Sequence, residues 1–92
     1  MNDDQIAHLE LERDKGQRAK HAFNNFIQPF VEEKRLVLFE AFQEVSVSNK
    51  DDLLEIKRQL MAINALETEI QTIIETGIMA EKALVAEQEK SE

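Results

Sequence analysis

The chain has no cysteine, tryptophan or tyrosine, and it has only two glycines and one proline among 92 residues. Without cysteine, a disulfide framework and thiolate metal sites are excluded. Because helix breakers are rare and good helix formers dominate, an all-α fold is predicted. No uncharged run approaches the length of a membrane span, and residues 1–20 lack the apolar run of a signal peptide. We therefore expect no membrane contact.

Basic residues are also few, with 11 against 19 acidic residues and a net charge of -8. This balance opposes binding to a phosphate backbone, which needs clustered Lys and Arg. Nucleic acid is therefore not an expected partner. A chain of this length forms one domain with a thin core and leaves much of its surface exposed.

The first 18 residues offer Asn2 as an N-cap, followed by two aspartates whose charge suits the start of a helix. Between residues 10 and 18 the only apolar side chain is Leu11, and Gly16 interrupts the stretch. We predict that residues 1–18 form a weakly packed N-terminal arm or helix. Deleting residues 1–16 is then expected to leave the thermal midpoint nearly unchanged.

Residues 19–86 are predicted to form a helical domain. Two helices, or one kinked helix, meet at Pro29, and the second helix is predicted to start there and to run to about Val45. Ser48 with Asp51 resembles a capping box, so a third helix starts near Asn49. Its apolar residues recur every three or four positions, which predicts a coiled-coil-like seam. The seam comprises Leu53, Ile56, Leu60, Ile63, Leu66, Ile70, Ile73, Gly77, Ala80 and Leu84.

The predicted architecture is a helical hairpin or three-helix bundle with a long C-terminal helix. Gly77 either ends that helix early or lies inside the seam, where it permits close packing. The polar residues 87–92 are predicted to be a disordered tail. Whether the long helix pairs within one chain or between chains stays open at this stage.

All five phenylalanines lie within residues 21–42. On a helical wheel, Leu36 and Phe39 project away from the apolar face of the second helix and are adjacent to each other. We predict that these two residues form a protein interface. The core face is predicted to hold Phe30, Val31, Val37, Leu38, Ala41, Phe42 and Val45.

A second, less apolar line follows the third helix. It fits an internal packing line of a three-helix fold slightly better than a contact surface, and both interpretations stay open. The line comprises Leu54, Met61, Ala65, Thr68, Thr72 and Met79.

No residue pattern indicates catalysis, a cofactor, a metal or a small-molecule substrate. His8 and Glu12 lie one helical turn apart but lack a third ligand, and His21 is interpreted as a boundary residue. The pairs Glu32–Glu33 and Asp51–Asp52 sit where helix N-termini attract acids. The chain is therefore predicted not to be an enzyme. A short basic island is interpreted as a solvated helix face, with a docking point for an acidic partner surface as the alternative. It comprises Arg13, Lys15, Arg18 and Lys20.

Four short motifs follow in order along the chain: RA at 18–19, QPF at 28–30, EAF at 40–42 and TGIMA at 76–80. In this order the chain resembles small acidic helical proteins encoded in the head-morphogenesis clusters of tailed bacteriophages. The resemblance covers roughly residues 17–85. It implies a virion-associated or assembly protein that acts by contact, located in the virion or the host cytoplasm.

The expected function is a non-enzymatic structural or interaction protein, which packs its helices onto a larger protein or onto copies of itself. The alternative is a small acidic inhibitor of a host defence or transcription protein that mimics nucleic acid. Such a mimic needs ordered rows of carboxylates. The basic-free stretch 59–81 holds only four, and they are spread around the helix. The sequence does not identify the partner or the copy number.

Overall fold

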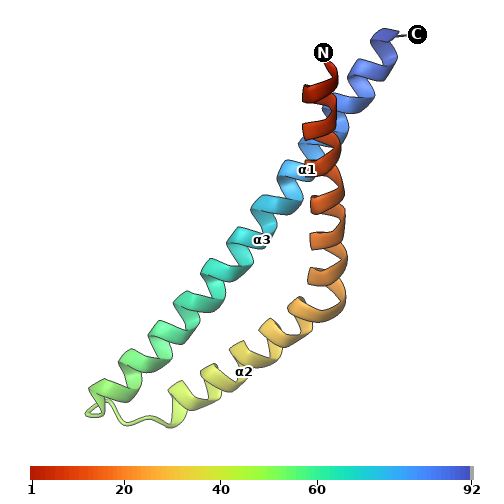
Figure 1. The fold of residues 1–92 in the computed structure, drawn as a ribbon. Coiled ribbons are helices and arrows are strands. Elements are labelled where there is room, and N and C mark those ends of the chain that lie inside the picture. The colour runs from red at the N-terminus through yellow and green to blue at the C-terminus, as the bar shows by residue number, and fades with distance from the viewer. Residues whose placement is uncertain (92) are drawn as a thin grey trace.

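The computed structural model describes residues 1–91 and forms α1 (Asp3–Ala22), the π-helical η1 (Phe23–Ile27), α2 (Gln28–Glu44) and α3 (Lys50–Ser91). The predicted all-α class and long C-terminal helix are confirmed. The first three elements make one continuous, bent limb, and the chain then doubles back so that α3 runs beside it (Figure 1). The molecule is thin, with extents of 67 × 21 × 15 Å. No helix in residues 1–91 has both the length and the apolar character needed to cross a membrane.

Helix α1 begins with a capping box. The Asn2 side-chain oxygen accepts a hydrogen bond from the Gln5 backbone N–H at 2.8 Å, and the Gln5 side-chain oxygen accepts one from the Asn2 N–H at 3.0 Å. Two otherwise unpaired backbone donors are thereby satisfied. The predicted N-cap is confirmed, and Gln5 supplies the reciprocal half that completes the box.

Helix α1 packs against α3 through two glycines. Gly16 and Gly77 are buried, and a Cβ built on either one would lie only 2.8 Å from the Cα of the other. The two backbones therefore touch where the helices cross. Of the two alternatives predicted for Gly77, the structure has the second: the residue lies inside α3 and does not end it. Of the weakly packed arm or helix predicted for residues 1–18, the structure has a helix, and Gly16 brings it against α3. A backbone contact between glycines leaves no apolar pattern in the sequence, so this contact was not predicted.

The limb bends where α1 passes through η1 into α2. In this turn the backbone N–H of Gln28 donates to the carbonyl of Phe23, five residues earlier. Pro29 has no N–H to donate, and its ring would collide with the preceding turn of a regular α-helix. The wider π turn removes the collision, so the predicted junction at Pro29 is a bend in a continuous helix.

Helix α3 starts one residue later than a capping box at Ser48 and Asp51 would place it. Asn49, not Ser48, is the capping residue: its side-chain oxygen accepts from the Asp52 backbone N–H at 3.3 Å, and its amide donates to the Asp52 carboxylate at 2.7 Å. Ser48 instead shares a hydrogen bond with Ser46. At the other end, the helix continues through residues 87–91, where a disordered tail was predicted, and residue 92 lies outside the described residues.

The main core lies between α2 and α3. Val31, Leu38, Ile56 and Ile63 are buried there, with Ile27, Ala41, Val45 and Leu60 packed around them. The wider core face predicted for α2 is wrong in part, because three of its members are at least half exposed: Phe30, Val37 and Phe42. Helix α2 packs along α3 alone, and one neighbour covers only a narrow stripe of a helix.

The second apolar line of α3 is not internal. All six of its residues are exposed within this chain, so it does not serve as an inner packing line. The reason is again the small number of neighbours, since α1 and α2 follow one another along a single side of α3 (Figure 1).

Candidate functional site

Leu36 and Phe39 lie on α2, and their exposed fractions are 57% and 59%. They are three positions apart and therefore adjacent on the helix surface. Phe39 lines a groove between α2 and α3, whereas Leu36 lies one turn away on the outer side of the helix. Their role as an interface stays a prediction, but the structure places both where a partner would reach them.

The groove beside Phe39 encloses about 490 Å³ and has an apolar floor. Leu38 and Ile56, both buried, form part of that floor. Phe39 and Phe42 make the α2 wall, and Leu53 and Leu60 belong to the α3 side. The complete lining is Arg35, Leu38, Phe39, Phe42, Leu53, Ile56, Lys57 and Leu60.

Two further apolar side chains extend the α3 side of the groove. Leu54 and Met61 lie three residues before and four residues after Lys57, so the three share one strip of the helix. Both are exposed, Met61 to 60%. We call the groove together with its exposed apolar neighbours the groove face. It comprises the lining residues Phe39, Phe42, Leu53 and Leu60 and the flanking residues Leu36, Leu54 and Met61.

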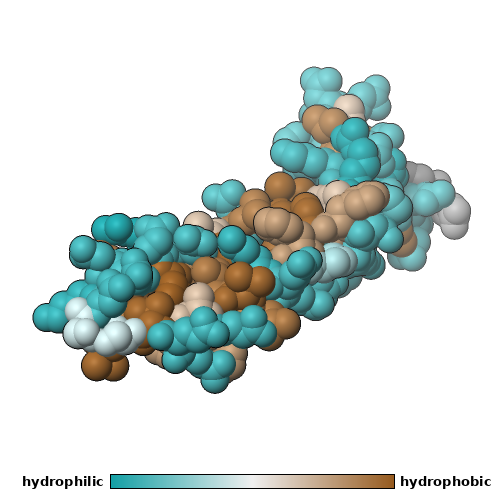
Figure 2. All heavy atoms as spheres, turned by 90° about the horizontal axis from the view of Figure 1, so that it is seen from below, coloured by the Kyte–Doolittle hydropathy of each residue, from teal (hydrophilic) through white to brown (hydrophobic). Residues whose placement is uncertain are grey.

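Another apolar area lies on the opposite side of α2. Phe26, Phe30 and Val37 are exposed to 71%, 60% and 50%. The ring of His21 meets that of Phe26 edge-on, with centroids 6.4 Å apart. Viewed from below, apolar atoms gather in the part of the molecule that holds α2 and the bend, bordered by hydrophilic atoms (Figure 2). We call Phe26, Phe30 and Val37 the back face.

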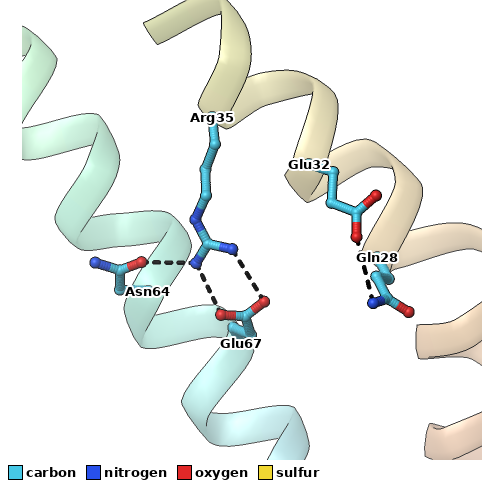
Figure 3. A network of polar contacts seen from close by, with 5 residues as sticks. All are labelled: Gln28, Glu32, Arg35, Asn64 and Glu67. Carbon is cyan, nitrogen blue, oxygen red and sulfur yellow. Dashed lines mark hydrogen bonds and ion pairs between the residues drawn. The ribbon is translucent and has the colours of Figure 1, made fainter. Parts of the chain in front are cut away.

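An ion pair lies at the end of the groove that is nearest the bend. The Arg35 guanidinium donates to both oxygens of Glu67, at 2.7 and 3.2 Å, and to the side-chain oxygen of Asn64 at 2.7 Å (Figure 3). The hydrogen bond from Arg35 holds the pKa of Glu67 below its ordinary value, and the same bond raises the pKa of Arg35. This network of charge-assisted hydrogen bonds ties α2 to α3.

Sequence reasoning missed the Arg35–Glu67 pair, although one signal was present. Glu67 lies seven residues after Leu60 and seven before Ile74, so it occupies an apolar position of a heptad and faces α2. A charged residue at such a position needs a partner from the facing helix. Arg35 supplies it.

The histidines of the described chain make only local contacts. His8 pairs with Glu12 one turn along α1, and His21 contacts the Asn25 side chain at 3.1 Å. Among residues 1–91, no three His, Cys, Asp or Glu side chains are grouped so that they could hold a metal ion.

Comparison with protein-family models, characterised proteins and solved structures finds no match for this chain.

Proposed function

We propose that this chain is a non-enzymatic structural or interaction protein that works by packing its helices onto another protein surface. The proposal rests on the exposure of the aromatic side chains to solvent. Four of five phenylalanines are more than half exposed: Phe26, Phe30, Phe39 and Phe42. Large apolar side chains gathered on two consecutive elements, here η1 and α2, mark a surface for contact, because each contributes roughly 1.5 to 3 kcal/mol when it is removed from water.

The groove face suits a helix or a ridge of side chains. Its floor is apolar, its walls come from two helices, and its charged groups stand at the border. This is the arrangement of protein interfaces, in which an apolar centre is surrounded by a polar rim. A small-molecule substrate would require convergent polar groups inside the hollow, and the lining offers Arg35 and Lys57 alone.

We infer an assembly role in a bacteriophage virion from the resemblance of four motifs of this chain to those of head-morphogenesis proteins. Each motif falls at a joint of the molecule. RA lies near the end of α1, QPF opens α2, EAF lies near its end, and TGIMA contains the glycine at the α1–α3 crossing. The location in virion or host cytoplasm belongs to the same proposal.

Mimicry of nucleic acid receives less support. Glu67, one of the four carboxylates in the basic-free stretch of α3, is bound by Arg35 of the same chain. The groove, which is the natural contact point, is lined by two basic residues and by none of the carboxylates of residues 1–91. A basic host surface would not be drawn to it.

Affinity purification of the tagged full chain from its native source tests the proposed function, with light scattering of the purified chain as a companion measurement. We expect the chain either to have a mass above 10.6 kDa or to retain a specific protein. A monomer that retains no protein at micromolar concentration would contradict the proposal.

A further inference from the structure

We propose that the groove face binds the groove face of a second copy of this chain, so that the α2–α3 halves of two molecules form a four-helix interface. This inference rests on the proposed function and names its partner. A two-fold contact places the same patch of both copies face to face, so the patch must be complementary to itself, as a surface with both a projection and a hollow can be. The groove face has both, since Phe39 and Phe42 stand beside the groove that their counterparts would enter.

The exposed area of the chain supports a partner of this size. The solvent-accessible surface is 7107 Å². A compact monomer of 10.6 kDa would expose about 5,500 Å², so the chain carries an excess of about 1,600 Å². This excess belongs to the whole elongated chain, and covering about half of it on each of two copies would bury about 1,600 Å² in total, the size of a standard protein–protein interface.

Charge selects the groove face as the place where two acidic chains can meet. Each copy carries a net charge of -8, so association through carboxylate-bearing surfaces would bring like charges together. Within the described chain, the groove lining contains Arg35 and Lys57 and no acidic residue. Arg35 is held by Glu67, and Lys57 stands at the border, where its charge stays hydrated.

The back face is the matched alternative. It is also apolar, and its residues Phe30 and Val37 come from α2, so substitutions there control for a general effect of placing charge on this helix. We choose the groove face over it because Phe39 and Phe42 combine a ridge with a hollow of about 490 Å³, whereas the choice of the back face would rest on exposure alone.

The experiment is sedimentation equilibrium of the full chain over a range of concentrations. It compares the wild type with Leu36→Glu/Phe39→Glu on the groove face and Phe30→Glu/Val37→Glu on the back face. We expect the wild type and the back-face variant to reach twice 10.6 kDa. The groove-face variant should have its dissociation constant raised by about 100-fold or more, because two large side chains lose their burial. Circular dichroism should show unchanged helix content.

Two further measurements keep the test decisive if a double variant unfolds. Met61→Glu changes one exposed residue on the other wall of the groove and should also weaken the dimer. The chain has no cysteine, so a single spin label at Lys57→Cys reports only distances between copies. It should give a short distance, and a label at Glu44→Cys a longer one.

Each other outcome has a defined meaning. A dimer broken by the back-face variant but not by the groove-face variant would overturn the groove face as the interface. A wild-type monomer that captures a different protein, with capture lost in the groove-face variant, would overturn self-association and leave the proposed function standing. A monomer that captures nothing would overturn both.

Discussion

The two halves of the molecule hold α3 in different ways. At the α1 end the helices touch through the backbones of Gly16 and Gly77, and Ile74 and Ala80 are buried nearby. At the α2 end large side chains keep the helices apart, and they leave a groove walled by phenylalanines. The first half makes a close backbone contact, and its exposed large apolar residues are Met1, Leu11, Ile78, Met79 and Val85. The second half exposes four phenylalanines and has an apolar groove between its helices, and it is the half to which we assign function.

Deletion of residues 1–16 should lower the stability of the protein more than any other change proposed for the two halves. It removes most of α1 together with Gly16, and it exposes the part of α3 that α1 covers. We expect the thermal midpoint, measured by circular dichroism at fixed protein concentration, to fall by more than about 10 °C. An unchanged midpoint would return residues 1–18 to the weakly packed arm that the sequence indicated.

Ile63→Ala should break the core of the α2 half. Ile63 is buried in the same cluster as Val31, Leu38 and Ile56. We expect the free energy of unfolding to fall by about 2 to 5 kcal/mol, as for other large-to-small core changes. Ile63→Val, which removes one methyl group, should cost about 0.5 to 1.5 kcal/mol. Urea titration measures both variants. A loss below about 1 kcal/mol for the alanine would mean that the seam is not buried there.

Gly77→Ala tests the backbone contact in the α1 half. The added Cβ would meet the Cα of Gly16 at 2.8 Å, so the helices must separate. We expect a loss of about 1 to 3 kcal/mol, the usual cost of overpacking, even though alanine is the better helix former. Thr76→Ala at the exposed neighbouring position serves as the control. If Gly77→Ala instead raised the free energy of unfolding by about 1 kcal/mol, helix propensity alone would determine the effect. The backbones of α1 and α3 would then not be in close contact at Gly77.

The smallest effect should come from Glu67→Gln at the boundary of the two halves. Because the folded-state pKa of Glu67 is lowered from 4.5, the ion pair contributes stability above that value and loses it as the pH falls through the lower, folded value. The wild type should therefore exceed the variant in urea midpoint at pH 7, and the difference should shrink near pH 3. A difference that stays constant with pH would show that the charge of Glu67 plays no part.

Much of the fold follows from local sequence signals. The Asn2 cap, the junction at Pro29 and the long last helix each rest on residues within one or two turns, and the structure has all three. The packing of α1 could not be predicted from apolar periodicity, because its key residue, Gly16, has no side chain and looked like a weak point. Local patterns describe helices better than the contacts between them.

The candidate site was predictable only in part. The wheel separated Leu36 and Phe39 from the core face, and both are exposed. It also assigned Phe42 to the interior, because it assumed more neighbours than α2 has in this chain. The groove depends on how α2 and α3 lie against each other, so no single-helix pattern could reveal it.

Hydrogen exchange at several protein concentrations tests the contrast between the two halves most directly. If the α2 half takes up a second copy, amides of α2 and of residues 50–61 should exchange more slowly as the concentration rises. Amides of α1 and of residues 73–84 should exchange at a constant rate, because their contacts lie within one chain. Protection that does not change with concentration in either half, or that increases in α1 alone, would contradict the account.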